Sequence, residues 1–256
     1  MKRILAAFIF FTRLPLWRLA DIDKRYYERV VPLWPMVGWL TGGVMTLVCW
    51  AALQVLPAGV AVVLALLARI LLTGALHEDG FADFCDGFGG GTTRERILQI
   101  MKDSHIGTYG VLGLLGYLLL MYNVTTALAG LCGLPLFFLI GDTLCKYLSS
   151  WITTFLPYAR KESEAKSRLI YAEIPVQERL LSVALAIFPL LLCWPWCSAA
   201  LLWGFLVATL TALLCAGLMF RLMKRGIQGY TGDCCGATFV VTETVFYLTL
   251  LVCLSL

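Results

Sequence analysis

Long apolar runs separated by polar connections make up most of this chain. A helix needs about 20 apolar residues to cross the roughly 30 Å hydrocarbon core of a bilayer. Seven runs come close to or exceed that length: 31–56, 58–76, 110–131, 133–156, 180–194, 197–219 and 236–256. The run 180–194 is short and contains Pro189, so a kinked or partly re-entrant segment is expected there. The pattern predicts an all-α, polytopic membrane bundle of about seven transmembrane helices, within a range of six to eight.

The N-terminal segment differs from these runs. Lys2 and Arg3 precede a short apolar stretch that ends at Phe11, and Arg13 and Arg18 follow it. A signal peptide begins in a similar way, but no A-x-A-like cleavage site follows here. The stretch is too short to span, so it is predicted to be an amphipathic helix that lies in the membrane interface.

The connections between the runs are of two kinds. Three are short and uncharged, at 56–59, 131–134 and 194–197. Four are long and charged, at 13–29, 77–109, 157–179 and 221–235. Of the 20 Lys and Arg residues, 18 fall in the N-terminus or in the long connections. The positive-inside rule places the long connections in the cytoplasm. We therefore expect a multi-pass protein of the bacterial cytoplasmic (inner) membrane, with its C-terminus outside and an active site that faces the cytoplasm.

Composition narrows the class further. The chain is 60% hydrophobic and only 14% charged, with a mean hydropathy of +0.84. A soluble domain carries roughly 25% charged residues, so a water-soluble enzyme is excluded, as are disorder and collagen. The ten cysteines include no CxxC and lie mostly in apolar runs, where Cys acts as a small hydrophobe. With no repeat and no soluble second region, residues 1–256 are predicted to form a single membrane-embedded domain.

An acidic cluster directly follows the run 58–76 and is predicted to continue its helix. Asp79, Asp83 and Asp86 are spaced i, i+4, i+7 and share one helical face, with Glu78 beside it. Carboxylates this close repel one another unless a cation lies between them. Oxygen ligands favour Mg²⁺ or Mn²⁺, and Mg²⁺ prefers a few carboxylates together with substrate phosphates. The alternative is a solvated helix end whose acidic residues happen to repeat.

The rest of the connection 77–109 adds basic groups and a histidine. Thr92 and Glu95 read as a capping box for an amphipathic surface helix at 93–103, which carries Arg94 and Arg96. His105, just beyond this helix, is a candidate proton acceptor. A plain surface anchor explains the helix equally well.

Four ionisable residues fall within apolar runs: Arg69, Asp142, Lys146 and Glu243. For Asp142 and Lys146 a functional role is the default interpretation, although their i, i+4 spacing also suits mutual pairing. Asp233 lies in a glycine-lined turn before the last run. It is either a ligand contact or an N-terminal helix cap.

Four sequence blocks resemble the cobalamin synthase family over nearly the whole chain. They are Phe10-Phe11-Thr12-Arg13-Leu14-Pro15, His77-Glu78-Asp79-Gly80-Phe81-Ala82-Asp83-x-x-Asp86-Gly87, Lys102-Asp103-Ser104-x-x-Gly107-x-x-Gly110 and Gly229-x-x-Gly232-Asp233-x-x-Gly236. The resemblance implies adenosylcobinamide-GDP ribazoletransferase activity, the last step of nucleotide-loop assembly in vitamin B12 biosynthesis. The substrates would be adenosylcobinamide-GDP and α-ribazole or its 5′-phosphate, and the products adenosylcobalamin or its 5′-phosphate and GMP. A divalent ion is implied, normally Mg²⁺, with Mn²⁺ as a substitute.

The chemistry of such a transfer assigns roles to the cluster. Phosphoryl transfer depends on charge neutralisation and in-line positioning. We expect Asp79, Asp83 and Asp86 to hold Mg²⁺ on the pyrophosphate, with Glu78 as a further ligand or base. His105 is the remaining catalytic candidate. Candidates for substrate binding are Lys102, Asp103, Asp142, Lys146 and Asp233, with Arg94 and Arg96 as further phosphate contacts.

Other classes fit less well. A CDP-alcohol phosphotransferase pattern would need Ala where Asp83 stands, and an aromatic (UbiA-like) prenyltransferase usually has two Asp-rich loops. A cation transporter is disfavoured because the charge lies on one side of the membrane. The expected partners are the lipid bilayer and the two substrates, not nucleic acid. A homo-oligomer and an association with other enzymes of nucleotide-loop assembly both remain open.

Overall fold

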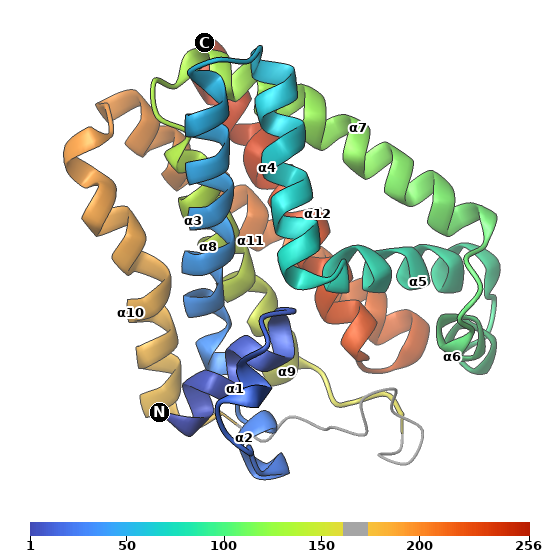
Figure 1. Cartoon of the computed structure of the whole chain (residues 1–256). Helices are drawn as coiled ribbons and strands as arrows, with labels where there is room; N and C mark the ends of the chain where they lie inside the picture. The colour runs from blue at the N-terminus through green and yellow to red at the C-terminus, as the bar shows by residue number, and fades with distance from the viewer. Residues whose placement is uncertain (161–173) are drawn as a thin grey trace.

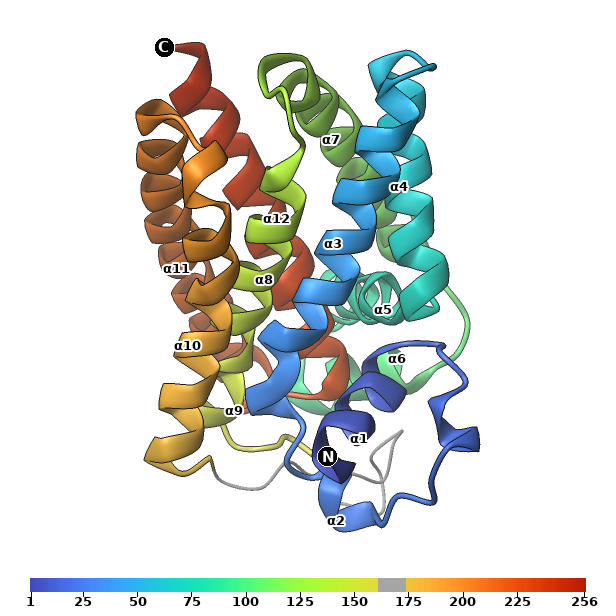
Figure 2. The ribbon, with the colours of Figure 1, turned by 60° about the vertical axis from the view of Figure 1, so that its left-hand side comes forward.

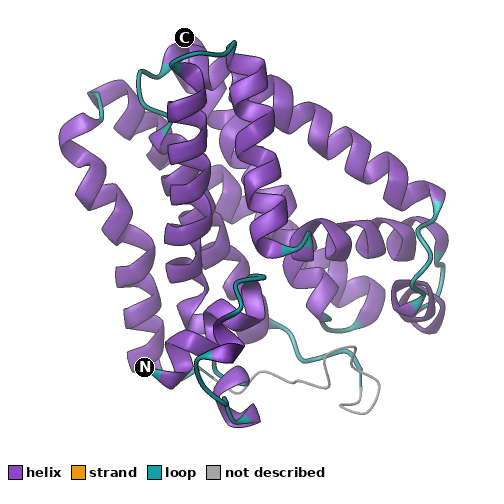
Figure 3. Cartoon of the chain, in the orientation of Figure 1, coloured by secondary structure: helices purple, strands orange, loops and turns teal. Residues whose placement is uncertain are grey.

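A computed structural model describes residues 1–160 and 174–256 of the chain. Every regular element in these ranges is a helix, so the all-α prediction is confirmed (Figures 1 and 3). Residues 161–173, with the basic residues of the connection 157–179 that they contain, lie outside the described residues.

The apolar runs form the long helices of a bundle (Figure 2). α8 lies within it and packs against α3, α10, α11 and α12, while α7 packs against α4, α5 and α12. The long helices are α3 (Trp34–Leu53), α4 (Ala58–Thr73), α7 (Thr108–Leu131), α8 (Leu136–Ser150), α10 (Val176–Cys193), α11 (Ala199–Ile227) and α12 (Gly232–Ser255). Each of the seven predicted runs therefore contains a helix.

Fewer than seven of the helices are long and apolar enough, each on its own, to count as a membrane span. Among the described residues, five helices are long and apolar enough to cross a membrane: α3, α7, α10, α11 and α12. A sixth is counted if α4 and the following α5 (Leu76–Gly90) form one span that is bent by 88°. The difference arises because α8 has only 15 residues and α4 only 16. The run around Pro189 is among the five, since α10 and the 3₁₀ turn after it extend it to 21 residues.

The shorter elements gather at the end of the bundle that holds the N-terminus (Figures 1 and 2). They are α1 (Lys2–Phe11), α2 (Lys24–Tyr27), α5, α6 (Arg94–Lys102) and α9 (Ile152–Phe155), with 3₁₀ turns at Leu16–Arg18 and Val31–Leu33. We call this end the polar end. The short turns after α3, α7 and α10 lie at the other end, with the C-terminus (Figure 2). The prediction that the long connections share one side is thus confirmed for their described parts.

The N-terminal helix α1 is attached to the bundle. It buries Ala6, Ala7 and Phe11, and it packs against α2 and α3. The Arg3 guanidinium donates two hydrogen bonds of 2.7 Å to the carboxylate of Glu178 at the start of α10. The predicted helix is therefore present, and its place in a membrane interface stays a prediction.

Glycines bring α3 and α8 into close contact. A Cβ on Gly38 would lie 2.7 Å from the Cα of Thr143, and one on Gly42 would lie 2.7 Å from the carbonyl oxygen of Phe138. Small residues of this kind let helix backbones approach closely inside a membrane. The approach places Thr41 of α3 against Asp142 of α8, which begins the polar interior described next.

Candidate functional site

The acidic cluster lies on α5, a helix that turns away from the bundle axis. Gly74 and Ala75 both have left-handed backbone conformations, with φ of +66° and 58°. They end α4, and α5 leaves at 88° to it (Figure 1). The prediction that the cluster simply continues the helix 58–76 is therefore wrong, because two left-handed residues break the helix first.

The four acidic side chains of α5 have different environments. Glu78 is buried against the bundle, and Asp86 is buried near the far end of the helix. Asp79 is exposed and Asp83 is half-buried. Asp79, Asp83 and Asp86 share one face of α5 as predicted, because the helix is continuous from Leu76 to Gly90. Asp86 and Glu78 nevertheless make separate contacts with other parts of the fold.

Asp86 connects α5 to the start of α7. Its two carboxylate oxygens accept hydrogen bonds from the backbone N–H groups of Gly107, at 2.7 Å, and Gly110, at 2.8 Å. The first N–H groups of a helix have no partner within the helix, and the helix dipole favours negative charge there. Side chains on these glycines would overlap the Asp86 carboxylate. Asp86 thus holds the loop before α7 against α5.

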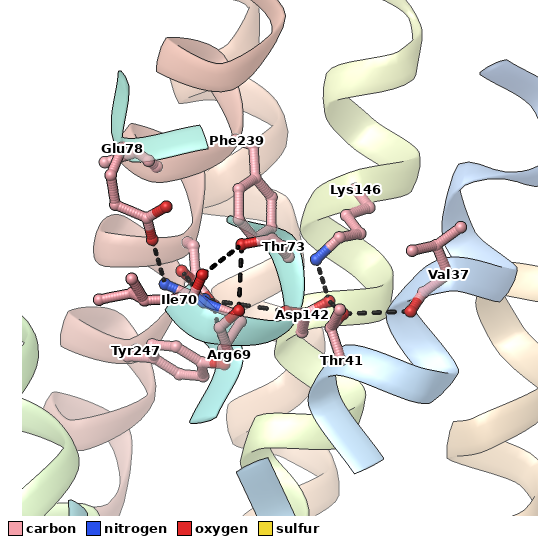
Figure 4. Close-up of polar contacts among 12 residues, drawn as sticks. Val37, Thr41, Arg69, Ile70, Thr73, Glu78, Asp142, Lys146, Phe239 and Tyr247 are labelled. Atoms are coloured by element: carbon pink, nitrogen blue, oxygen red, sulfur yellow. Dashed lines mark hydrogen bonds and ion pairs between the residues drawn. The ribbon is translucent and has the colours of Figure 1, made fainter. Parts of the chain in front are cut away.

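Glu78 belongs to a buried charge network with Arg69, Asp142, Lys146 and Glu243 (Figure 4). Nη1 of Arg69 lies 2.6 and 2.7 Å from the two carboxylate oxygens of Glu243 on α12 and 3.7 Å from Asp142. Nη2 of Arg69 lies 3.4 Å from Glu78. A guanidinium has five donors in a fixed fork, which suits it to several acceptors at once.

The second cation of the network, Lys146, has a separate set of partners. Its ammonium group donates to Asp142 one turn earlier on α8, and Asp142 also accepts a hydrogen bond of 2.8 Å from Thr41. The ring of Phe239 lies under Lys146, 4.1 Å from Nζ to the ring centroid. The predicted pairing of Asp142 with Lys146 is confirmed. Both Asp142 and Lys146 are fully buried, whereas Asp79 of α5 is exposed.

Two hydroxyl groups complete the network. Tyr117 of α7 accepts a hydrogen bond from Arg69, and Tyr247 of α12 donates one of 3.3 Å to Glu243. The sequence identified Arg69 and Glu243 as ionisable residues in apolar runs but gave them no role at the site. The two tyrosines carried no such signal, because a tyrosine in an apolar run is ordinary packing.

The loop between α6 and α7 carries the remaining candidates. Lys102, Asp103 and His105 are all exposed. Nδ1 of His105 lies 2.7 Å from the Asp103 carboxylate, and the backbone N–H of His105 donates to the same carboxylate at 3.0 Å. The hydrogen bond from the His105 side chain, followed by that from its backbone, lowers the pKa of Asp103.

α6 begins one residue later than the sequence indicated. Its N-cap is Thr93, which accepts a hydrogen bond from the N–H of Arg96, rather than Thr92. The Arg94 side chain donates to the carbonyl oxygens of Ile227, at 3.0 Å, and Ala159, at 2.8 Å. Arg94 therefore holds three connections of the polar end together instead of facing an open site.

Asp233 lies in the first turn of α12, beside the start of α5. Thr231, not Asp233, is the N-cap of α12, and it accepts a hydrogen bond from Cys234 N–H. A Cβ on Gly80 would come within 3.0 Å of the Asp233 backbone, and one on Gly236 within 3.0 Å of the carbonyl oxygen of His77. The two glycines let α5 and α12 touch, which places Asp233 next to the acidic helix.

The predicted four-carboxylate metal site is not assembled. Within residues 1–160 and 174–256, no group of three or more His, Cys, Asp or Glu side chains is close enough to hold a metal ion. Glu78 and Asp86 make the contacts already described, while Asp79 is exposed and Asp83 is half-buried on the same helix. Two carboxylates fit Mg²⁺, which completes its shell with water and substrate phosphates.

Comparisons with known proteins cover nearly the whole chain. The profile of the family described as cobalamin-5-phosphate synthase matches residues 3–251. A relative from Shewanella amazonensis is 36% identical over 98% of this chain and 95% of its own length. A relative from Shewanella baltica is 35% identical over 97% of this chain and 93% of its own length. A relative from Shewanella frigidimarina is 36% identical over 96% of this chain and 92% of its own length. All three carry the name adenosylcobinamide-GDP ribazoletransferase. No solved structure matches the chain.

Proposed function

Because this chain belongs to the cobalamin-5-phosphate synthase family, we propose that it joins adenosylcobinamide-GDP to α-ribazole or α-ribazole 5′-phosphate. A ribose hydroxyl attacks the phosphorus that bears the cobinamide arm. The bond from that phosphorus to the bridging oxygen breaks, and GMP leaves. The products are adenosylcobalamin, or its 5′-phosphate, and GMP. The names of the relatives supply the donor substrate and the ribazole transfer.

One observation of the structure supports this chemistry at α5. The helix presents Asp79 and Asp83 one turn apart on its accessible side, while Glu78 and Asp86 fix the helix from within. Asp79 and Asp83 would hold Mg²⁺, or Mn²⁺ in its place, and the bound ion would neutralise charge on the pyrophosphate.

The start of α12 contributes to binding the pyrophosphate. The N-terminus of this 24-residue helix lies against α5 at Gly80. Unpaired N–H groups and the helix dipole make such an end attractive to phosphate. Lys102, exposed at the end of α6, is a further phosphate contact in this proposal.

His105 is the proposed acceptor of the hydroxyl proton. Its Nδ1 is held by Asp103, which leaves Nε2 to receive the proton, in the arrangement by which a carboxylate orients a catalytic imidazole. Asp86 keeps this loop at α5 by binding Gly107, two residues beyond His105.

The polar end is proposed to face the cytoplasm, since the basic connections lie there. The membrane would then be the bacterial cytoplasmic membrane. This orientation gives nucleotide substrates direct access to α5 from the side on which they are made.

Turnover of the purified, detergent-solubilised protein tests the function. The reaction contains adenosylcobinamide-GDP, α-ribazole and Mg²⁺, and a parallel reaction contains a chelator. We expect adenosylcobalamin and GMP in equal amounts, with loss of both on chelation and recovery when Mg²⁺ is restored. A folded preparation that forms neither product would refute the proposal.

A further inference from the structure

The contact between Arg69 and Glu78 bridges the bend between α4 and α5. Nη2 of Arg69 lies 3.4 Å from Oε1 of Glu78, and nine residues separate the two along the chain. Both side chains are buried, at 1% and 7% exposure. The contact therefore joins the end of α4 to the first turn of α5.

The bend itself does not fix how α5 is rotated about its own axis. It consists of Gly74 and Ala75 in left-handed conformations. The left-handed conformation is unfavourable for an L-residue such as Ala75. Such a link holds its shape only when surrounding contacts determine it. The packing of α5 against α12, α7 and α6 supplies part of those contacts, and Glu78 supplies the charged one at the start of α5.

Arg69 offers a firm attachment point because three other helices hold it. Glu243 of α12 binds Nη1, Tyr117 of α7 binds Nη2, and Asp142 of α8 lies 3.7 Å away. Glu78 adds α5 to this set. A rotation of α5 that withdrew Glu78 would leave a carboxylate in an apolar interior without its cation, which is costly.

Consecutive residues of an α-helix point about 100° apart, given 3.6 residues per turn. With Glu78 directed at Arg69, Asp79 and Asp83 are directed to the accessible side. We infer that Glu78 is a positioning residue: it acts through Arg69 to fix the rotation of α5 and so aims Asp79 and Asp83. This inference rests on the proposed function only in taking Asp79 and Asp83 to bind the metal ion and, through it, the substrate pyrophosphate.

The competing interpretation makes Glu78 a metal ligand, as the sequence suggested. Its second oxygen, Oε2, is buried and accepts no hydrogen bond from the described residues, so a ligand role is a specific alternative. The two roles differ when metal is absent. A positioning residue orders α5 without metal, whereas a ligand acts only when metal is bound.

Hydrogen exchange of the metal-free protein separates these roles. Glu78→Ala and Glu78→Gln are compared with the wild type in chelator, and Glu95→Ala and Glu95→Gln serve as matched controls at an exposed glutamate of α6. Loss of a hydrogen bond to a charged group, worth about 1.5–3 kcal/mol, corresponds to exchange on the order of tenfold faster or more. We expect that acceleration across residues 76–90 in Glu78→Ala, a smaller one in Glu78→Gln, and none in the controls.

Unchanged exchange of α5 in metal-free Glu78→Ala, with Mn²⁺-induced protection lost, would overturn the inference. Should Glu78→Ala fail to fold, Glu78→Gln decides through turnover. Its amide keeps one oxygen for Arg69, so we expect at least about a tenth of wild-type turnover and a Mg²⁺ requirement unchanged. Inactivity of a folded Glu78→Gln would also overturn the inference. An inactive wild type with the expected exchange pattern would instead refute the proposed function alone.

Discussion

The carboxylate of Glu243 on α12 and the guanidinium of Arg69 on α4 form an ion pair in which both side chains are almost wholly buried. They are 174 residues apart in the sequence. Charges in a low-dielectric interior are stable only when they are paired and hydrogen-bonded. The pair therefore ties the C-terminal helix to the helix that leads into the acidic segment.

Replacing Arg69 with Met is expected to lower stability strongly. The change leaves Glu243, Glu78 and Asp142 with Lys146 as the remaining cation of the network described above. Breaking a buried pair costs about 3–5 kcal/mol. Thermal unfolding in detergent measures the loss, and the double variant Arg69→Met/Glu243→Met should lose less than the sum of the two single variants. Additive losses would show that the two residues do not act as a pair.

Asp83→Asn is expected to abolish turnover without unfolding the protein. Asp83 is half-buried on the accessible side of α5, so a neutral amide fits the same space. We expect a fall in turnover on the order of 10²-fold or more, as for the loss of one transition-state contact. Asp79→Asn should behave alike, and the exposed Asp21→Asn serves as control. Wild-type turnover in Asp83→Asn would remove this residue from the metal assignment.

The contact between α3 and α8 predicts different effects at two neighbouring glycines. A Cβ on Gly42 would lie 2.7 Å from the carbonyl oxygen of Phe138, whereas a Cβ on Gly43 would meet nothing within 4 Å. Gly42→Ala should therefore cost about 1–3 kcal/mol through overpacking. Gly43→Ala should be neutral or stabilising by up to about 1 kcal/mol, because alanine favours a helix. Melting temperatures in one detergent compare the two, and equal effects would contradict this packing.

His105→Ala is expected to lower turnover by about 10²–10⁴-fold, the usual contribution of a proton acceptor. Thermal stability should change little, since the side chain is 90% exposed. Ser104→Ala, at the neighbouring exposed position, is the control. A variant with normal turnover at neutral pH would show that another group takes the proton.

The same variant changes the titration of Asp103. The pKa of this carboxyl is lowered chiefly by the hydrogen bond from the His105 side chain. A carboxyl group whose pKa is lower in the folded protein stabilises the fold at pH values above its ordinary pKa. This stabilisation is lost as the pH falls through the lowered pKa of the folded protein. Asp103 is therefore ionised at neutral pH in both proteins. In His105→Ala its pKa should rise towards the ordinary value, which carboxyl NMR signals would report.

The class of fold was predictable because each long helix of the bundle is encoded by its own apolar run, which is local information. The acidic motif on α5 was predictable as a set of residue types, but the different contact that each of its acidic side chains makes was not. Spacing placed Asp86 on the same face as Asp79 and Asp83, yet Asp86 binds the N–H groups of Gly107 and Gly110. Those partners lie more than 20 residues away, and only the three-dimensional fold determines that they meet.

The buried charge network likewise contains contacts between distant residues that the sequence alone does not predict. The i, i+4 spacing of Asp142 and Lys146 was enough to predict their pairing, because both lie on one helix. The partners of Arg69 lie on α12, α7, α8 and α5. No spacing rule connects residues on separate helices, so the sequence identified the ionisable residues but not their contacts.

The N-terminus and the C-terminus lie at opposite ends of the bundle (Figures 1 and 2). A chain whose two ends lie on opposite sides of a bilayer crosses it an odd number of times. The turns after α3, α7 and α10 lie at the end opposite the polar end (Figure 2), so α4 and α8 each carry the chain back towards the polar end. A crossing by both α3 and α7 therefore requires a return through α4 and α5, and a crossing by both α7 and α10 requires a return through α8. With α11 and α12 this makes seven passages, an odd number.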